Sequence, residues 1–285
     1  MAALRCRKEV RVSLTWLQAM VLGVSQGLTE FLPISSSAHT LLISRIMGWG
    51  DPGAAFTAVT QVGTEAAVIW YFRHDIAGIV STWAASLVRR ELRSDPRARM
   101  GWYVIIGTLP IGVLGVAFKQ QIETSARNLR VVGVALIVGG LVLGYMDHVT
   151  RHTRTQDAIT PRNALALGMG QALALIPGVS RSGATITVGL ALGLTREVAA
   201  RYSFLLAIPA VLASAALEAA DIGADAAANW PATIVATIVA AGVGYAVIAR
   251  LMSWLRTGSF APFVAYRVVL GVSVMLMVGS GFIAA

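Results

Sequence analysis

Two proline-containing polar stretches interrupt an otherwise apolar chain, and they restrict its fold more than any other feature. The first, QGLTEFLPISSSAH, covers residues 26–39 and places an acid, three serines and a histidine inside an apolar segment. The second, PGVSRSGAT, covers residues 177–185 and places an arginine between two serines. Lipid cannot satisfy the peptide groups of a non-helical backbone, so such a break must face protein or a water-filled cavity. We therefore expect both stretches to lie inside the protein.

The composition indicates an integral membrane protein. Of the 285 residues, 56% are hydrophobic and 13% are charged, against roughly 25% charged in soluble domains. This length allows about six to eight membrane segments of about 20 residues each. The net charge of +9 comes from arginines between the apolar runs, where they indicate topology and contact with anionic membrane lipids, and not a nucleic-acid surface. The single cysteine, Cys6, excludes an intramolecular disulfide and a cysteine metal cluster.

The pattern of apolar runs predicts an all-α integral membrane protein with six transmembrane helices and two re-entrant helical hairpins. We expect the whole chain, residues 1–285, to form one membrane domain. Residues 73–99 are expected to form a basic loop between two spans. The hairpins are expected at 14–50 and 163–194, because neither half of these broken segments reaches about 20 residues. The full spans are expected at residues 54–72, 101–118, 131–145, 202–217, 231–249 and 263–283.

The two breaks belong to an internal duplication. Residues 22–40 align without a gap with residues 167–185, with seven identities in nineteen positions. We predict two repeats, 14–146 and 163–283, of inverted topology. The arginine-rich loops at residues 73–100, 147–162 and 250–262 are assigned to the cytoplasm, which makes the hairpins enter from opposite faces. The basic N-terminus opposes this assignment.

The second break is suited to bind phosphate. Arg181 offers a planar fork that matches phosphate oxygens, and the hydroxyls of Ser180, Ser182 and Thr185 are further donors. The backbone N–H of Gly183, near an expected helix start, adds to an anion-binding turn. The alternative is that Arg181 caps a helix end and pairs with a carboxylate.

The first break offers reactive groups that the second lacks. Ser36 or another serine of the run could attack phosphorus. His39, one helical turn after Ser36, could activate that serine or protonate the leaving group. Glu30 could hold a divalent cation or orient the histidine, with Gln26 as a neutral ligand. The second copy has Arg181 at the position of Ser36, so the two copies are interpreted as halves of one site.

Two further groups of polar residues remain open at this point. The serines shared by both copies, Ser35 and Ser37 in the first, are expected to contact phosphate. Gln61 and Glu65, one turn apart in the span at 54–72, could form a wall of the site or a buried polar pair.

Together the two stretches resemble the signature motifs of the undecaprenyl pyrophosphate phosphatases, the BacA-type membrane enzymes. The resemblance extends over essentially the whole chain, including YRVVLG at residues 266–271. It implies dephosphorylation of undecaprenyl pyrophosphate, an isoprenyl pyrophosphate lipid of the bacterial plasma membrane, with a divalent cation such as Mg²⁺ or Ca²⁺. By motif position it implies catalytic roles for Glu30, Ser36, His39 and Arg181, surrounded by Gln26, Ser35, Ser180, Ser182 and Thr185. Gln26 departs from the glutamate that is frequent in the family, and Ala38 from a common glycine.

Other functions fit some of these features. Inverted repeats, broken helices and a midplane anion site are also typical of a transporter or flippase of a phosphorylated isoprenoid lipid. A lipid phosphatase of the soluble-acid-phosphatase type would have two spaced histidines, which the second break lacks. Small-residue spacings at Gly140/Gly144 and Gly189/Gly193 allow close helix packing within the chain or in a homodimer. The sequence leaves open whether Ser36 or His39 attacks phosphorus.

Overall fold

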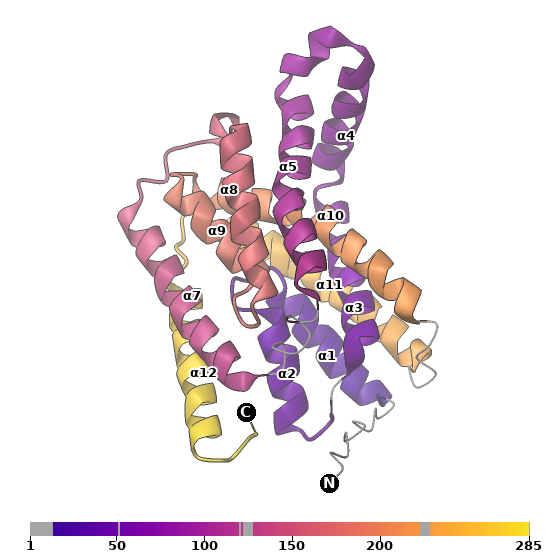
Figure 1. Cartoon of the computed structure of the whole chain (residues 1–285), viewed down its shortest axis with the longest axis vertical. Coiled ribbons are helices and arrows are strands. Elements are labelled where there is room, and N and C mark those ends of the chain that lie inside the picture. The colour runs from indigo at the N-terminus through magenta and orange to yellow at the C-terminus, as the bar shows by residue number, and fades with distance from the viewer. Residues whose placement is uncertain (1–13, 51, 120, 122–127, 223–228, 285) are drawn as a thin grey trace, which may run out of the picture.

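The computed structural model describes residues 14–50, 52–119, 121, 128–222 and 229–284, and its regular elements in these ranges are helices (Figure 1). Cys6, the basic N-terminal residues and parts of the loops after α5 and α10 lie outside the described residues. The α-helices are α1 (Trp16–Thr29), α2 (Ser36–Ile46), α3 (Gly53–Tyr71), α4 (Arg73–Val88), α5 (Pro96–Ala117), α7 (Leu129–Val149), α8 (Pro161–Ala172), α9 (Arg181–Ala191), α10 (Arg196–Ile222), α11 (Trp230–Trp254) and α12 (Ala261–Gly279). Three short 3-10 helices are η1 (Arg90–Ser94), η2 (Gln156–Ala158) and η3 (Leu173–Leu175).

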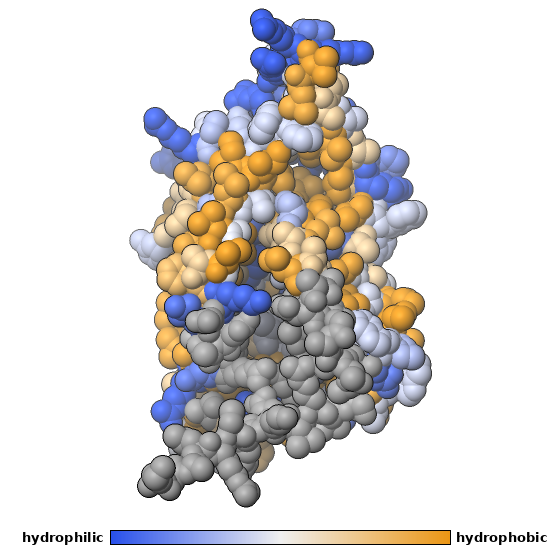
Figure 2. Space-filling view, turned by 45° about the vertical axis from the view of Figure 1, so that its right-hand side comes forward, coloured by the Kyte–Doolittle hydropathy of each residue, from blue (hydrophilic) through white to orange (hydrophobic). Residues whose placement is uncertain are grey.

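Five of the described helices are long and apolar enough to cross a membrane: α5, α7, α10 up to Leu217, α11 and α12. They match five of the six expected spans. The sixth, α3, forms at the expected place, but Gln61 and Glu65 lie in its middle and make it more polar. Apolar side chains such as Leu109 and Val113 of α5 lie on the outside of the molecule, as Figure 2 shows for much of one face. The chain is thus an all-helical, multi-pass membrane protein.

The expected basic loop at residues 73–99 is wrong, because this segment is mostly helical. It forms α4, η1 and the first turn of α5, and this helical hairpin projects beyond its neighbours (Figure 1). Apolar residues between the arginines drive the folding. Trp83 of α4 packs edge-on against Trp102 of α5 at 5.7 Å between ring centroids, and Gly101 lies directly against Trp83. The loop prediction rested on the arginines of this segment and did not consider the apolar residues that join α4 to α5.

The two polar stretches form helical hairpins, α1–α2 and α8–α9, with the same backbone turn. Ser35 has φ 73° and Ser180 has φ 70°, and these serines occupy aligned positions immediately before α2 and α9. A left-handed backbone costs a non-glycine residue about 1–2 kcal/mol, so its presence in both copies indicates a shared structural requirement. Each following helix has 11 residues.

The two hairpins also pack in equivalent ways. A Cβ on Gly23 of α1 would lie 2.5 Å from the carbonyl oxygen of Ala236 in α11, and the aligned Gly168 of α8 faces the backbone of Gly107 in α5. Only glycine allows these backbones to approach so closely. The hairpins reach inward from opposite ends of the molecule in Figure 1, and their turns meet near its middle.

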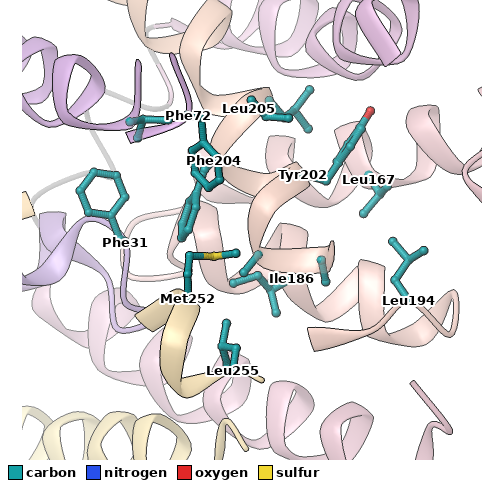
Figure 3. Close-up of a cluster of buried hydrophobic side chains, with 14 of the residues drawn as sticks. Phe31, Phe72, Leu167, Ile186, Leu194, Tyr202, Phe204, Leu205, Met252 and Leu255 are labelled. Carbon is teal, nitrogen blue, oxygen red and sulfur yellow. The ribbon is translucent and has the colours of Figure 1, made fainter. Parts of the chain in front are cut away.

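A buried apolar cluster fixes the first turn against the rest of the helices. Phe31, beside Glu30, packs edge-on against Phe204 of α10 with ring centroids 5.4 Å apart. Phe72 lies 6.5 Å from the same Phe204 ring (Figure 3). Phe31 and Phe204 are each 1% exposed. Burial of Phe31 therefore holds the neighbouring carboxylate in a defined place.

Three of the small-residue positions serve packing within the chain. Gly140 and Gly144 of α7 face α12, with Arg267 and Val264 as their nearest neighbours, and Gly189 of α9 faces Ala199 of α10. This contact favours the intramolecular interpretation of the spacing. A homodimer stays a prediction.

Candidate active site

The two hairpin turns bring their polar residues to one cavity of about 190 Å³. Its wall combines the first turn, the second turn and α3 with apolar residues of α5 and α10. The polar residues that line it are Glu30, Ser35, Ser36, Ser37, Gln61, Ser180, Arg181 and Ser214. The sequence-based expectation that the two copies form halves of one site is therefore met in space for Glu30, Ser36 and Arg181.

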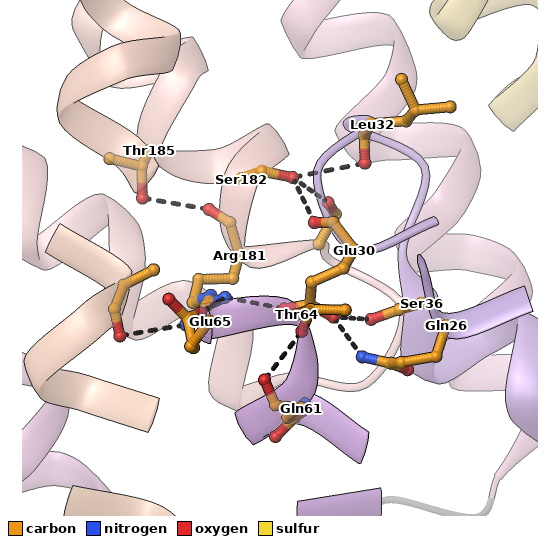
Figure 4. Close-up of polar contacts among 12 residues, drawn as sticks. Gln26, Glu30, Leu32, Ser36, Gln61, Thr64, Glu65, Arg181, Ser182 and Thr185 are labelled. Atoms are coloured by element: carbon orange, nitrogen blue, oxygen red, sulfur yellow. Dashed lines mark hydrogen bonds and ion pairs between the residues drawn. The ribbon is translucent and has the colours of Figure 1, made fainter. Parts of the chain in front are cut away.

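Arg181 lies between two buried carboxylates (Figure 4). Its Nη2 donates to Oε1 of Glu30 at 2.7 Å and to Oε1 of Glu65 at 2.9 Å, while Nη1 donates to the carbonyl oxygen of Ala207 at 3.3 Å. Glu30 comes from the first turn, Glu65 from α3 and Arg181 from the start of α9. The pairing of this arginine with carboxylates is thus confirmed. Arg181 also lines the cavity, and its contact with phosphate stays a prediction.

Ser36 is hydrogen-bonded to Glu30. Its hydroxyl donates to Oε2 of Glu30 at 2.6 Å, and the side-chain amide of Gln26 donates to the same oxygen at 2.7 Å. The short distance is that of a charge-assisted bond to a carboxylate. A serine hydroxyl within hydrogen-bond reach of a base is the arrangement that an activated nucleophile requires.

His39 has different neighbours from those expected. Its Nδ1 lies 2.7 Å from the carbonyl oxygen of Ser35, and its Nε2 lies 2.7 Å from the hydroxyl of Tyr266. The rings of His39 and Tyr266 are stacked, with an interplanar angle of 7°. With both ring nitrogens engaged in this way, His39 contacts neither Ser36 nor Glu30 through the described hydrogen bonds. Its role in proton transfer stays a prediction.

The serines on either side of Ser36 and Arg181 repeat each other's contacts. The hydroxyls of Ser35 and Ser37 lie 3.2 Å apart, and so do those of Ser180 and Ser182. Ser35, Ser37 and Ser180 line the cavity, whereas the hydroxyl of Ser182 lies within 3.4 Å of the carbonyl oxygens of Glu30 and Leu32. Ser182 thus joins the second turn to the first.

Two other predicted phosphate ligands have partners within the protein. The backbone N–H of Gly183 donates to Oγ of Ser180 at 3.2 Å, and the hydroxyl of Thr185 donates to the carbonyl of Arg181 at 3.0 Å. Both contacts stabilise the beginning of α9. Neither residue lines the described cavity, and their contact with phosphate stays a prediction.

Arg267 of α12 connects both turns, although it lies outside the two polar stretches and was not predicted as a site residue. This side chain is fully buried. It donates to the carbonyl of Pro33 in the first turn at 3.1 Å, to that of Val179 in the second at 3.0 Å and to that of Leu136 in α7 at 3.2 Å. An arginine inside an apolar span is costly and usually functional, and that signal was present in the YRVVLG segment.

The donor set beside Arg181 fits a hard divalent cation. In the part of the chain that the structure describes, no three His, Cys, Asp or Glu side chains gather at one point. Glu30 and Glu65 still provide carboxylate oxygens there, and Oε2 of Glu65 is buried with no hydrogen-bond partner among the described residues. Magnesium ions are commonly held by one or two carboxylates, completed by waters and substrate phosphates.

The fold and the site define an all-helical membrane protein whose polar centre is assembled from two similar helical hairpins. The family model described as "Bacitracin resistance protein BacA" matches residues 19–273, and the chain belongs to this family. The resemblance expected from the motifs is thus confirmed.

Curated relatives match nearly the whole chain. Undecaprenyl-diphosphatase 2 of Streptomyces avermitilis is 52% identical, over 94% of this chain and 96% of its own length. Undecaprenyl-diphosphatase of Thermobifida fusca is 52% identical, over 93% of this chain and 91% of its own. Undecaprenyl-diphosphatase of a Nocardioides species is 54% identical, over 95% of this chain and 99% of its own.

Proposed function

We propose that this protein is an undecaprenyl-diphosphatase of the bacterial plasma membrane. It hydrolyses undecaprenyl pyrophosphate to undecaprenyl phosphate and inorganic phosphate, which recycles the lipid carrier of cell-wall synthesis and supports bacitracin resistance. The names of relatives above 50% identity support this function. The observation that carries it in the structure is the hydroxyl of Ser36, which donates to Glu30 beside Arg181 in one cavity.

The geometry supports a mechanism in two steps. Oγ of Ser36 attacks the terminal phosphorus, its proton moves to Glu30, and the bond to the bridging oxygen breaks, which releases undecaprenyl phosphate. Water then hydrolyses the phosphoserine to serine and inorganic phosphate. Arg181, with the hydroxyls of Ser35 and Ser180, binds the oxygens of the transferred phosphoryl group. Direct attack by His39 is the alternative.

A divalent cation, Mg²⁺ or Ca²⁺, belongs to this proposal, with Glu30 as a ligand. When bound, the cation would neutralise charge on the phosphate oxygens. Gln26 donates its amide to Glu30 and so holds the carboxylate in place. It contributes no charge of its own.

Transport of the lipid is the less favoured function. A carrier of a phosphorylated isoprenoid needs the arginine and hydroxyl donors of the second turn. It gains nothing from a serine hydrogen-bonded to a carboxylate in the first turn alone. The relatives are named as diphosphatases.

The direct test is phosphate release from a long-chain isoprenyl pyrophosphate by the purified protein in detergent. We expect metal-dependent release by the wild type and none above background by Ser36→Ala. In vesicles, movement of the lipid across the bilayer without phosphate release would contradict the enzyme function and favour a flippase.

For the membrane arrangement we propose six spans, with α3 as the sixth, and two re-entrant hairpins of inverted topology. The arginine-rich ends of the hydrophobic helices support cytoplasmic placement of residues 94 and 155. Single cysteines can test it after replacement of Cys6. Ser94→Cys and Thr155→Cys should resist an impermeant thiol reagent on intact cells, while Lys119→Cys and Ser280→Cys should react. A reversed pattern would invert the arrangement, and a mixed one would refute the six-span count.

A further inference from the structure

Glu65 carries a buried oxygen that the described protein groups leave unsatisfied. The residue is 0% exposed. Its Oε1 accepts from Nη2 of Arg181 at 2.9 Å, but Oε2 has no hydrogen-bond partner among the described residues. Leaving a carboxylate oxygen buried and unpaired is costly, more so than for a neutral group. Glu65 does not itself line the cavity, but its ion-pair partner Arg181 does. We therefore expect this oxygen to gain a ligand when the substrate binds.

The charges at this point also require a further cation. Glu30 and Glu65 share one guanidinium, so the buried group carries a net negative charge when both acids are ionised. A pyrophosphate is itself an anion, and like charges repel strongly where water is excluded. Binding of the substrate next to two carboxylates therefore needs more positive charge than Arg181 supplies.

Arg181 cannot serve the carboxylates and the phosphate fully at the same time. Its Nη2 has two hydrogens, and the contacts at 2.7 Å to Glu30 and 2.9 Å to Glu65 use both. A bidentate contact with phosphate through this nitrogen requires at least one carboxylate to find another partner. A divalent cation bound to oxygen ligands would be that partner.

We propose that Glu65 is the second carboxylate ligand of the divalent cation. Arg181 holds Glu30 and Glu65 together before the cation binds, and it turns to the pyrophosphate when the cation replaces it. Gln26 gives Glu30 only an amide donor, so the second negative charge of the metal site comes from α3 and not from the first turn. This inference rests on the proposed requirement for a hard divalent cation.

Direct metal binding tests this inference independently of turnover. Mn²⁺ is the probe, and its free concentration is measured by electron paramagnetic resonance with the full-length purified protein in the absence of lipid substrate. Glu65→Gln and Glu30→Gln should each weaken Mn²⁺ binding about tenfold or more, because each removes a charged ligand. Glu91→Gln, at an exposed acid in η1, is the matched control and should bind as the wild type does.

Arg181→Gln gives the sharpest prediction. This substitution frees both carboxylates from their ion pairs. The variant protein should therefore bind Mn²⁺ more tightly than the wild type, although it loses activity. If Glu65 only positions Arg181, Glu65→Gln will bind Mn²⁺ as tightly as the wild type, and that result overturns the inference. Thermal unfolding without metal checks folding. If Glu65→Gln is unfolded, Glu65→Asp takes its place. It keeps the charge but withdraws the carboxylate by one methylene, so the folded variant should bind Mn²⁺ more weakly than the wild type, and wild-type affinity overturns the inference.

The two proposals fail in different ways. Phosphate release by a wild-type protein that binds no Mn²⁺ overturns the role of Glu65 as a metal ligand and leaves the diphosphatase function standing. Binding that depends on Glu30 and Glu65, in a protein that releases no phosphate from an isoprenyl pyrophosphate, supports the metal site and contradicts the function.

Discussion

The turn before α2 and the turn before α9 have nearly the same backbone and different chemistry. Ser35 and Ser180 adopt the same left-handed conformation, and each is followed by an 11-residue helix. The first residue of the helix is Ser36 in one copy and Arg181 in the other, and both line the cavity. The duplicated turn thus acts as a scaffold that presents its next side chain to a shared site.

The difference between the copies divides the work. In the proposed mechanism, the first hairpin supplies Ser36 as the nucleophile and Glu30 as the group that accepts its proton. The second hairpin supplies Arg181 as a positive charge for the phosphoryl group. Contacts between the turns, such as Ser182 with the carbonyls of the first turn, keep the two contributions in register.

The largest effect on turnover is expected at Ser36, the proposed nucleophile, which has no serine counterpart in the second copy. Ser36→Ala should lower turnover at least about 10³-fold, because loss of a nucleophile removes the covalent step. Substrate binding should be largely retained. The measurement is phosphate release at saturating substrate, together with affinity for the lipid.

Ser37→Ala is the matched control for Ser36→Ala. Ser37 lines the same cavity but lies 3.2 Å from the hydroxyl of Ser35, and Glu30 is not its partner. The loss of turnover in Ser37→Ala should therefore be much smaller than in Ser36→Ala. Equal losses from both variants would remove the special role of Ser36 in the first turn.

The counterpart in the second turn should show the next largest effect. Arg181→Lys keeps the charge but replaces the planar fork with a point charge, so we expect turnover to fall about 10²-fold. Arg201→Lys is the control, because Arg201 pairs with Asp75 at 2.9 Å outside the site. Near-normal turnover by Arg181→Lys would mean that the second turn contributes only charge.

Much of this comparison could be predicted from the sequence. The lengths of the apolar runs locate the breaks, and the gap-free alignment of the two copies pairs Ser35 with Ser180. The chemical types of Glu30, Ser36 and Arg181 were sufficient to suggest one shared site. These features depend on local sequence, which is why they were predictable.

The remaining features depend on contacts between distant segments. The bond between Arg267 and the carbonyl of Pro33 joins residues 234 positions apart, and no local pattern encodes it. Spacing along a helix suggested His39 as the partner of Ser36, yet the chain folds back so that Glu30 takes that place. The helix α4 was missed because its apolar contact with α5 forms only after folding.

Substitution of Arg267 tests whether both turns depend on its hydrogen bonds for their stability. Arg267→Met leaves several buried carbonyl groups without a donor, which should lower the free energy of unfolding by about 2 kcal/mol or more. Activity should fall with stability, because both turns lose the same anchor. Thermal unfolding in detergent measures this, with the exposed Arg130→Met as control; an unchanged melting temperature would show that the turns hold their shape without Arg267.

The smallest expected effects are changes in stability from substitutions at Ser35 and Ser180, which test the left-handed backbone of the two turns. Ser35→Gly should leave stability within about 1 kcal/mol of the wild type or raise it, because glycine adopts a positive φ without strain. Ser35→Val should destabilise the protein. Ser180→Gly should cost a few tenths of a kcal/mol more than Ser35→Gly, because only Ser180 bonds to a backbone N–H at the start of its helix. If Ser35→Gly and Ser35→Val are equally harmful, the shared left-handed turn is not what the copies conserve.

The central claim is that the first turn supplies the nucleophile, and trapping the phosphoenzyme tests it most directly. The protein is mixed with pyrophosphate lipid radiolabelled at the terminal phosphate, quenched rapidly and digested. We expect an acid-stable phosphoserine at Ser36 that is absent from Ser36→Ala and weak in Arg181→Lys. An acid-labile phosphohistidine at His39 that persists in Ser36→Ala would contradict the account.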